Sequence, residues 1–186
     1  MTRIFTLYDR FIHLMLRLLG DWFLPSIARF TFAATLLFYF WNSAMTKLGE
    51  GFFGFLSPSL NAYIQIFPAK TEAVGFDISG FNTFDWLVVT TGTWAEFILP
   101  LLIVIGLFTR IAAIGMIGFV FVQSFVDVTG HGVGGRDLGG WFDGASGSLI
   151  LDQRLFWVFT LVLLVIKGAG PISLDTLFKR FRVGWG

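Results

Sequence analysis

A glutamate near the middle of a long apolar run is the strongest candidate for chemistry in this chain. Glu96 lies within Trp86–Phe108, where most of the neighbouring side chains are hydrophobic. A carboxylate at that depth in hydrocarbon is costly unless it is neutral, paired or in contact with water. Pro100 follows four residues later and has no backbone N–H to donate to the Glu96 carbonyl. The sequence therefore predicts an ionisable side chain, a freed carbonyl and a kink within one helical turn.

Other polar residues of the apolar segments lie at the depth of Glu96 or nearer to the same face. We expect them to line a cavity that is polar toward the outside and closed by apolar side chains toward the inside. Glu96 is the predicted catalytic residue. The predicted ligand-binding residues around it are Asn42, Lys47, Thr93, Gln123, Asp127 and Arg154.

The role of Glu96 has two interpretations. An intramembrane carboxylate can relay protons or bind a ligand. Alternatively, Glu96 forms a buried ion pair or hydrogen bond with Lys47, Arg154 or Gln123 that only fixes helix packing. Lys47 likewise can extend to the outer interface beside Trp41, or turn inward with Asn42 toward Glu96.

The elements that must position these residues are membrane-spanning helices. Hydrophobic residues make up 55% of the 186 residues, charged residues only 13%, and mean hydropathy is +0.77. Four segments approach the ~20 residues needed to cross a bilayer. They predict an all-α membrane protein, a four-helix bundle in a single domain (residues 1–186), with spans at about 26–46, 86–108, 110–126 and 151–167.

The segments at both ends of the chain are amphipathic. Residues 3–20 predict a helix in the membrane interface, with arginines and His13 on its polar face, and residues 173–182 predict a short amphipathic tail. The stretches from the N-terminus to Arg29 and from Lys167 to the C-terminus, with Arg110, carry nine Lys/Arg against three acids, whereas the two long loops carry four against eight. The bias places both termini in the cytoplasm and the loops outside. The basic face suits anionic lipid headgroups, and no nucleic-acid partner is expected.

The two long loops offer weaker functional signals. Residues 48–85 are unusually apolar and predict short helical turns that pack on the mouth of the bundle or act as a lid. The glycine-rich loop contains Gly130, Gly132 and Gly135 in a G-x-G-x-x-G spacing, but a dinucleotide site needs a βαβ unit that the spans do not allow. His131 with Asp127, Asp137 and Asp143 could form an external metal site, although we expect none. The absence of cysteine excludes cysteine-bound iron–sulfur clusters and c-type haem, and no haem is expected.

Several stretches resemble the DoxX family of small bacterial membrane proteins. They are Phe40–Leu48 (FWNSAMTKL), Ala95–Glu96, Leu107–Ala113 (LFTRIAA) and Gly168–Asp175 (GAGPISLD). The resemblance implies a four-helix protein of the bacterial inner membrane. Some relatives are subunits of thiosulfate:quinone oxidoreductases, and others join redox or stress-defence complexes. Lys47, Glu96 and Arg110 are the positions that look family-like.

Two functions follow as hypotheses. The first is the membrane subunit of a quinone-linked redox complex, in which the bundle holds an isoprenoid quinone, Glu96 exchanges protons with the outside, and a protein partner carries electrons. The second is a non-catalytic accessory or assembly subunit of a larger membrane complex. A small-solute carrier is a weaker third, since no inverted repeat is evident.

Overall fold

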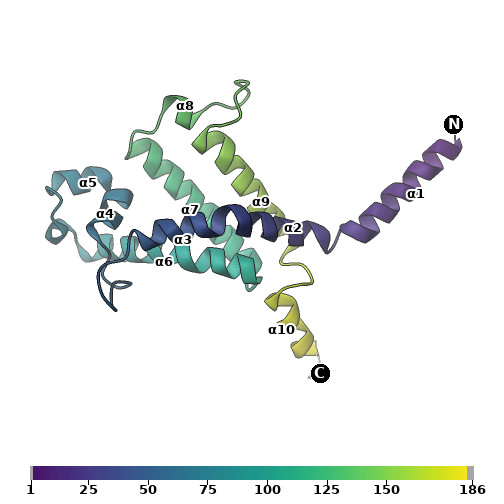
Figure 1. The fold of residues 1–186 in the computed structure, drawn as a ribbon, viewed down its shortest axis with the longest axis horizontal. Helices are drawn as coiled ribbons and strands as arrows, with labels where there is room; N and C mark the ends of the chain where they lie inside the picture. The colour runs from purple at the N-terminus through teal and green to yellow at the C-terminus, as the bar shows by residue number, and fades with distance from the viewer. Residues whose placement is uncertain (1, 184–186) are drawn as a thin grey trace.

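The protein is a bundle of long helices with shorter helices at both ends, as the computed structural model shows for residues 2–183 (Figure 1). No strand occurs among these residues. In chain order the elements are α1 Thr2–Leu19, α2 Phe23–Phe32, η1 Ala33–Leu37, α3 Phe38–Met45, α4 Leu60–Ile66, α5 Pro68–Ala73, η2 Ile78–Gly80, α6 Thr83–Ile105, α7 Thr109–Thr129, α8 Gly135–Leu138, η3 Leu149–Gln153, α9 Arg154–Lys167 and α10 Leu174–Val183.

Four helical segments are long and apolar enough to cross a membrane, which indicates a multi-pass membrane protein. The first is continuous through α2, the π-helical turn η1 and α3; the last combines η3 with α9. They cover Phe23–Met45, Thr83–Ile105, Thr109–Thr129 and Leu149–Lys167. We call the end of the bundle that contains Phe23 and Lys167 the terminal end, and the opposite end the loop end.

The observed helix boundaries differ by at most three residues from the expected ones, and local capping explains the clearest case. Asn82 and Asp85 each accept the other's backbone N–H at 2.9 Å, so α6 begins at Thr83 rather than Trp86. Gly106, with φ of 72°, then ends α6 in the left-handed conformation. Because of these capping residues, the second span begins and ends nearer to the loop end than the sequence predicted.

The main core lies between the four long helices. α7 packs against α6 and α9, while α2 packs against α9 and α3 against α6. Its fully buried side chains include Phe32, Phe40, Met116, Leu161 and Leu164. Because burial of these apolar groups fixes the relative positions of all four helices, polar residues on their loop-end halves are brought together as well.

A second, smaller core ties the first long loop to α6. Ala62 and Tyr63 of α4 are buried against Val89, and the ring centroids of Tyr63 and Phe81 are 4.5 Å apart. Burial raises the pKa of the Tyr63 hydroxyl above its ordinary value, and the nearby Asp85 carboxylate raises it further. The loop is thus a packed cover at the loop end, where the sequence predicted short helical turns.

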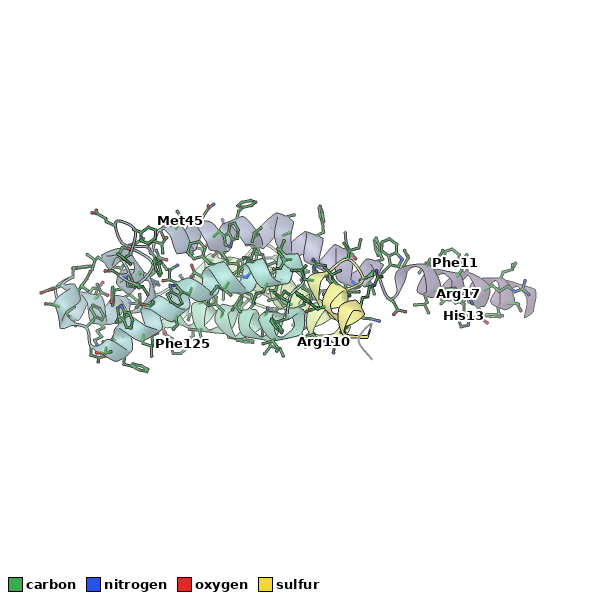
Figure 2. The ribbon with its side chains drawn as sticks, turned by 90° about the horizontal axis from the view of Figure 1, so that it is seen from below. Phe11, His13, Arg17, Met45, Arg110 and Phe125 are labelled. Carbon is green, nitrogen blue, oxygen red and sulfur yellow. The ribbon has the colours of Figure 1, made fainter. Side chains whose placement is uncertain are left out.

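Helix α1 projects away from the bundle, and Figure 1 shows it beyond the start of α2. Phe11, Arg17 and His13 are labelled on it in Figure 2; Phe11 and Arg17 are exposed. Its position in a membrane interface stays a prediction. The side chains of Arg3 and Arg182, which enter the charge count, lie outside the described part, as do residues 1 and 184–186.

Candidate functional site

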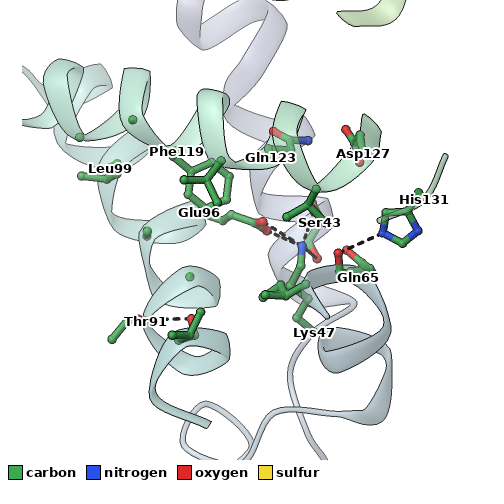
Figure 3. Close-up of a pocket in the computed structure, with 18 residues that line it drawn as sticks. Ser43, Lys47, Gln65, Thr91, Glu96, Leu99, Phe119, Gln123, Asp127 and His131 are labelled. Carbon is green, nitrogen blue, oxygen red and sulfur yellow. Dashed lines mark hydrogen bonds and ion pairs between the residues drawn. The ribbon is translucent and has the colours of Figure 1, made fainter. Parts of the chain in front are cut away.

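A buried ion pair joins the first and second spans. The Lys47 Nζ lies 2.8 Å from both carboxylate oxygens of Glu96, and it also donates to the Ser43 Oγ at 2.6 Å (Figure 3). Lys47 is 3% exposed and Glu96 5% exposed, so neither charge is solvated by bulk water. Of the two alternatives for Lys47, the structure contains the inward one.

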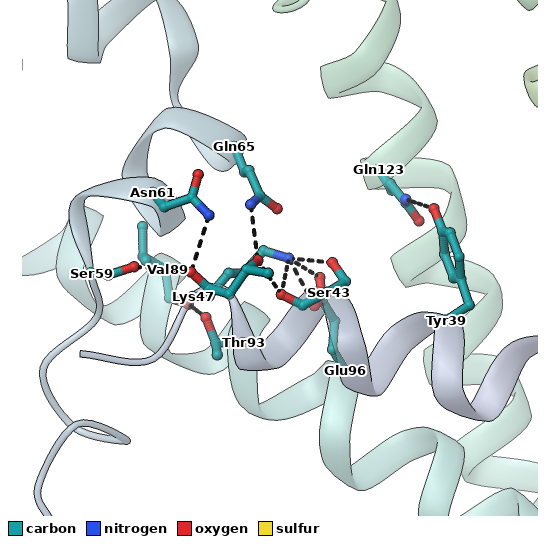
Figure 4. A network of polar contacts seen from close by, with 11 residues as sticks. Tyr39, Ser43, Lys47, Ser59, Asn61, Gln65, Val89, Thr93, Glu96 and Gln123 are labelled. Atoms are coloured by element: carbon teal, nitrogen blue, oxygen red, sulfur yellow. Dashed lines mark hydrogen bonds and ion pairs between the residues drawn. The ribbon is translucent and has the colours of Figure 1, made fainter. Parts of the chain in front are cut away.

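Three polar groups of the first loop hold Lys47 in this inward position (Figure 4). The chain leaves α3 at Thr46, whose backbone carbonyl accepts from the Asn61 amide and whose hydroxyl accepts from Gln65 at 3.2 Å. The Lys47 carbonyl accepts from the backbone N–H of Ser59 at 2.9 Å. These bonds fix the backbone of Thr46 and Lys47, while Ser43 and Glu96 bind the ammonium of Lys47 itself.

A cavity of about 480 Å³ lies beside the ion pair, within the range of ~300–1,000 Å³ that is typical of ligand pockets. Its wall on α6 includes Glu96 and Gly92, and its wall on α7 includes Gly118 and Gln123 (Figure 3). A Cβ added to Gly118 would meet no atom within 4 Å, so this glycine leaves space open. Of the small residues of α7, Ala112 and Ala113 are buried in the core, whereas Gly118 borders the cavity.

Polar side chains of α7 line the part of the site that lies farther from Glu96. Gln123 donates from Nε2 to the Tyr39 hydroxyl at 3.0 Å, and the other end of its amide is buried without a hydrogen-bond partner among the described residues. One turn farther, the Asp127 carboxylate pairs with the Arg154 guanidinium, which also donates to Ser124 at 2.8 Å. An unpartnered amide end in a cavity wall is a place where a ligand or water would bind.

The mouth of the cavity lies at the loop end. The His131 Nε2 is 3.1 Å from the Gln65 carbonyl oxygen, which connects the second loop to α4. The described residues contain no group of three or more His, Asp or Glu side chains that could hold a metal ion. The alternative of a metal centre at His131 therefore has no ligand cluster within residues 2–183.

The structure brings together most, but not all, of the predicted site residues. Glu96, Lys47, Gln123 and Asp127 line the cavity, and Arg154 lies directly behind Asp127. Two of the predicted ligand-binding residues do not line the cavity: Asn42 is exposed on α3, and Thr93 is buried but donates to the Val89 carbonyl of its own helix. Both lie on faces of their helices that turn away from the cavity, which a depth estimate alone does not reveal.

Sequence analysis missed three polar contributors. Ser43 lies four residues before Lys47 on the same helix face, a spacing that could have identified it. Gln65 and Tyr39 gave no such signal, because their positions depend on how α4 and α9 pack around the bundle.

The turn that contains Pro100 is stabilised from a neighbouring helix. α6 remains helical through Pro100, and the indole N–H of Trp41 donates to the Phe97 carbonyl at 3.1 Å. The Trp41 indole thus makes a contact between α3 and α6. Pro100 leaves the Glu96 carbonyl without its helical donor, and Trp41 adds a donor from outside α6 to the next carbonyl in the same turn.

Comparison of the chain with protein-family models, with curated proteins and with solved structures finds no match. Resemblance to the DoxX family therefore stays a prediction from the residues quoted above.

Proposed function

We propose that the protein is a membrane subunit that binds an isoprenoid quinone in the cavity beside Glu96. The observation that carries this proposal is a cavity of about 480 Å³ whose wall combines apolar side chains with a buried carboxylate and an unpartnered amide end. Thr91 and Val122 line it and are exposed on the spans, so the cavity reaches the lipid-facing surface. An amphiphile with a polar ring and an apolar tail fits this combination.

Glu96 and Gln123 are the residues that would hold the polar ring. An ionised carboxylate has about four acceptor sites, so Glu96 can accept a hydrogen bond from a hydroxyl of the reduced quinol while it is bonded to Lys47. The unpartnered Gln123 Oε1 on α7 can accept from a quinol hydroxyl as well. A bound quinone would supply reversible two-electron, two-proton chemistry. Lys47 keeps the carboxylate in place and stabilises its charge in a poorly solvated site.

The route for a released proton would follow the polar wall of α7. Gln123, Asp127 and His131 occupy successive positions from Glu96 to the mouth of the cavity (Figure 3). Since the charge bias places the loop end outside, protons would exchange with the outer compartment. Resemblance to DoxX proteins supports a bacterial inner membrane, cytoplasmic termini and a partner protein that exchanges electrons with the quinone.

The affinity of the purified protein for the added reduced form, the quinol, tests the proposal. Glu96→Gln should weaken quinol binding about tenfold, since one good charge-assisted hydrogen bond contributes about 1.4 kcal/mol or more. Thr93→Val is the matched control, because Thr93 is buried on the same helix one turn away and does not line the cavity. Equal affinity in the wild type, Glu96→Gln and Thr93→Val would rule out Glu96 as a ligand-binding residue.

A non-catalytic accessory subunit is the second candidate, and one observation favours it. Both oxygens of Glu96 already bond to Lys47, and Lys47 is also bonded to Ser43. An ion pair whose charged groups are all bonded within the protein can act in helix packing alone. Under this hypothesis, deleting the gene lowers the amount of a partner complex, and a Glu96→Gln variant that still folds restores it completely. Under the quinone hypothesis, the same variant restores the complex but not its quinone-dependent turnover.

A further inference from the structure

A second pocket, far from Glu96, lies at the terminal end of the bundle. It has a volume of about 610 Å³ and is bounded by the first turn of α7, the end of α9, the linker after α9, and α10. Because Thr109 begins one span and Lys167 ends another, the pocket lies at the boundary of the membrane. The quinone proposal does not use it.

Three cationic side chains from three different helices converge on this pocket: Arg110, Lys167 and Lys179. Within the described part of the chain, Arg110 and Lys179 make no ion pair. Lys167 approaches Asp21 only to 4.0 Å, and the Asp21 side chain is fully exposed. Such a surface contact contributes little, so the cations remain available to an anionic ligand.

The other carboxylate of the pocket is already bonded to backbone. Asp175 accepts from the backbone N–H groups of Phe108 at 2.8 Å and Thr109 at 3.0 Å, which satisfies the start of α7. Its charge therefore compensates the helix terminus rather than Arg110. The pocket keeps an excess of positive charge.

The walls of the pocket are held firmly. Arg29 donates to the carbonyls of Ile103 at 3.1 Å and Ala169 at 3.0 Å, which fixes the linker after α9 to the end of α6. Gly168 has a φ of 78°, and a Cβ there would lie 3.3 Å from the Arg110 Nε. A glycine thus allows the linker to pass close to the Arg110 guanidinium.

Apolar side chains border the cations on the spanning side. Trp22, Phe108 and Ile111 line the pocket and are exposed, and Ile111 is the residue after Arg110 on α7. A soluble anion would gain nothing from these groups, whereas acyl chains would cover them. We propose that this pocket binds the phosphate of an anionic phospholipid, with Arg110, Lys167 and Lys179 as its ligands.

Binding of phosphatidylglycerol and phosphatidylcholine to the purified full chain in detergent, followed by native mass spectrometry, tests the proposal. We expect the wild type to retain phosphatidylglycerol preferentially. Arg110→Gln/Lys179→Gln should lose about thirtyfold in that preference, because each of the two cations near a lipid phosphate contributes about 1 kcal/mol. Arg10→Gln/Arg17→Gln removes the same charge from exposed positions of α1 and should leave the preference unchanged.

Equal losses in the two double variants, or no preference in the wild type, would overturn a specific site. A second experiment, with inorganic phosphate, distinguishes between the phosphate of a lipid and free phosphate as the bound anion. If inorganic phosphate raises the melting temperature as much as phosphatidylglycerol does, and Arg110→Gln/Lys179→Gln removes both effects, then the pocket takes free phosphate and the lipid assignment is wrong. If only the lipid stabilises the wild type, the assignment stands.

Discussion

At the scale of single residues, the pairing of Lys47 with Glu96 is the decisive feature. Either charge alone would be strongly destabilising at this depth. In the pair, the two charges compensate each other across a distance of 2.8 Å. The pair also leaves carboxylate acceptor sites beside a cavity. One interaction thus serves both packing and, in our proposal, ligand binding.

A double-mutant cycle on this pair should show strong coupling. Lys47→Met and Glu96→Gln should each lower the free energy of unfolding by about 3–5 kcal/mol, because each leaves one buried group without its partner. The double variant should lose much less stability than the sum of the two single losses, because no unpaired charge remains. Thermal unfolding in detergent measures this, with Lys70→Met, which removes the half-exposed partner of Asp85, as a control with a smaller effect. Additive losses in the double variant would contradict coupling.

The chemistry of the site was predictable from residue type, but its geometry was not. An isolated carboxylate in an apolar run identified Glu96, and a lysine at the end of the first span gave a candidate partner. Asn42 and Thr93 were chosen by depth, yet helix rotation turns them away from the cavity. Rotation depends on which apolar face packs, and spans that are hydrophobic all round do not display that face in sequence.

At the scale of elements, α3 and α6 support each other around Pro100. The Trp41 indole N–H bonds the Phe97 carbonyl, one residue after Glu96, in the turn that the proline weakens. This contact lies between the ion pair and the main core, so it contributes to the position of Glu96.

Trp41→Phe should therefore lower the free energy of unfolding by about 1 kcal/mol, the usual net contribution of one hydrogen bond. Trp141→Phe removes an indole hydrogen bond from the second loop to Leu151 of η3 and serves as the control. Hydrogen exchange in α6 should increase around Phe97 in the first variant alone. Unchanged exchange there would show that Trp41 does not stabilise the turn.

Element boundaries followed from the sequence to within a few residues. Hydropathy located all four spans, while the ends were set by the Asn82–Asp85 capping box and by Gly106. The two π-helical turns, Ala33–Leu37 and Leu149–Gln153, had no sequence signal that we recognised. For the segment that forms α4, the sequence predicted only short helical turns at the mouth of the bundle. It did not predict how Tyr63 packs, because that packing involves residues far away in the chain.

At the scale of the whole molecule, the terminal end is fastened by charged side chains. Arg29 reaches carbonyls of α6 and of the linker before α10, and Asp175 reaches the start of α7. These contacts join segments that lie more than 60 positions apart in the chain, as between Arg29 and Ile103 with a separation of 74. They hold the segments that form the terminal pocket in fixed positions relative to one another.

Arg29→Lys should loosen this end, because an ammonium cannot reproduce the planar fork of a guanidinium. We expect a loss of about 2 kcal/mol in unfolding free energy, in line with hydrogen bonds from charged donors. The Asp175 amide, which donates to the Gly106 carbonyl at 2.8 Å, should exchange faster. Arg17→Lys on exposed α1 is the control, and equal effects of both substitutions would refute a fastening role for Arg29.

The central claim is that the cavity beside Glu96 holds an isoprenoid quinone, and quinone extracted from protein purified from native membranes tests it most directly. Gly118→Leu should fold, because an added Cβ meets no atom within 4 Å and leucine favours helix over glycine. It should nevertheless fill the cavity. We predict near-stoichiometric quinone in the wild type and at least about tenfold less in Gly118→Leu, a difference of about 1.4 kcal/mol. Equal quinone in both proteins, or none in either, would contradict the claim.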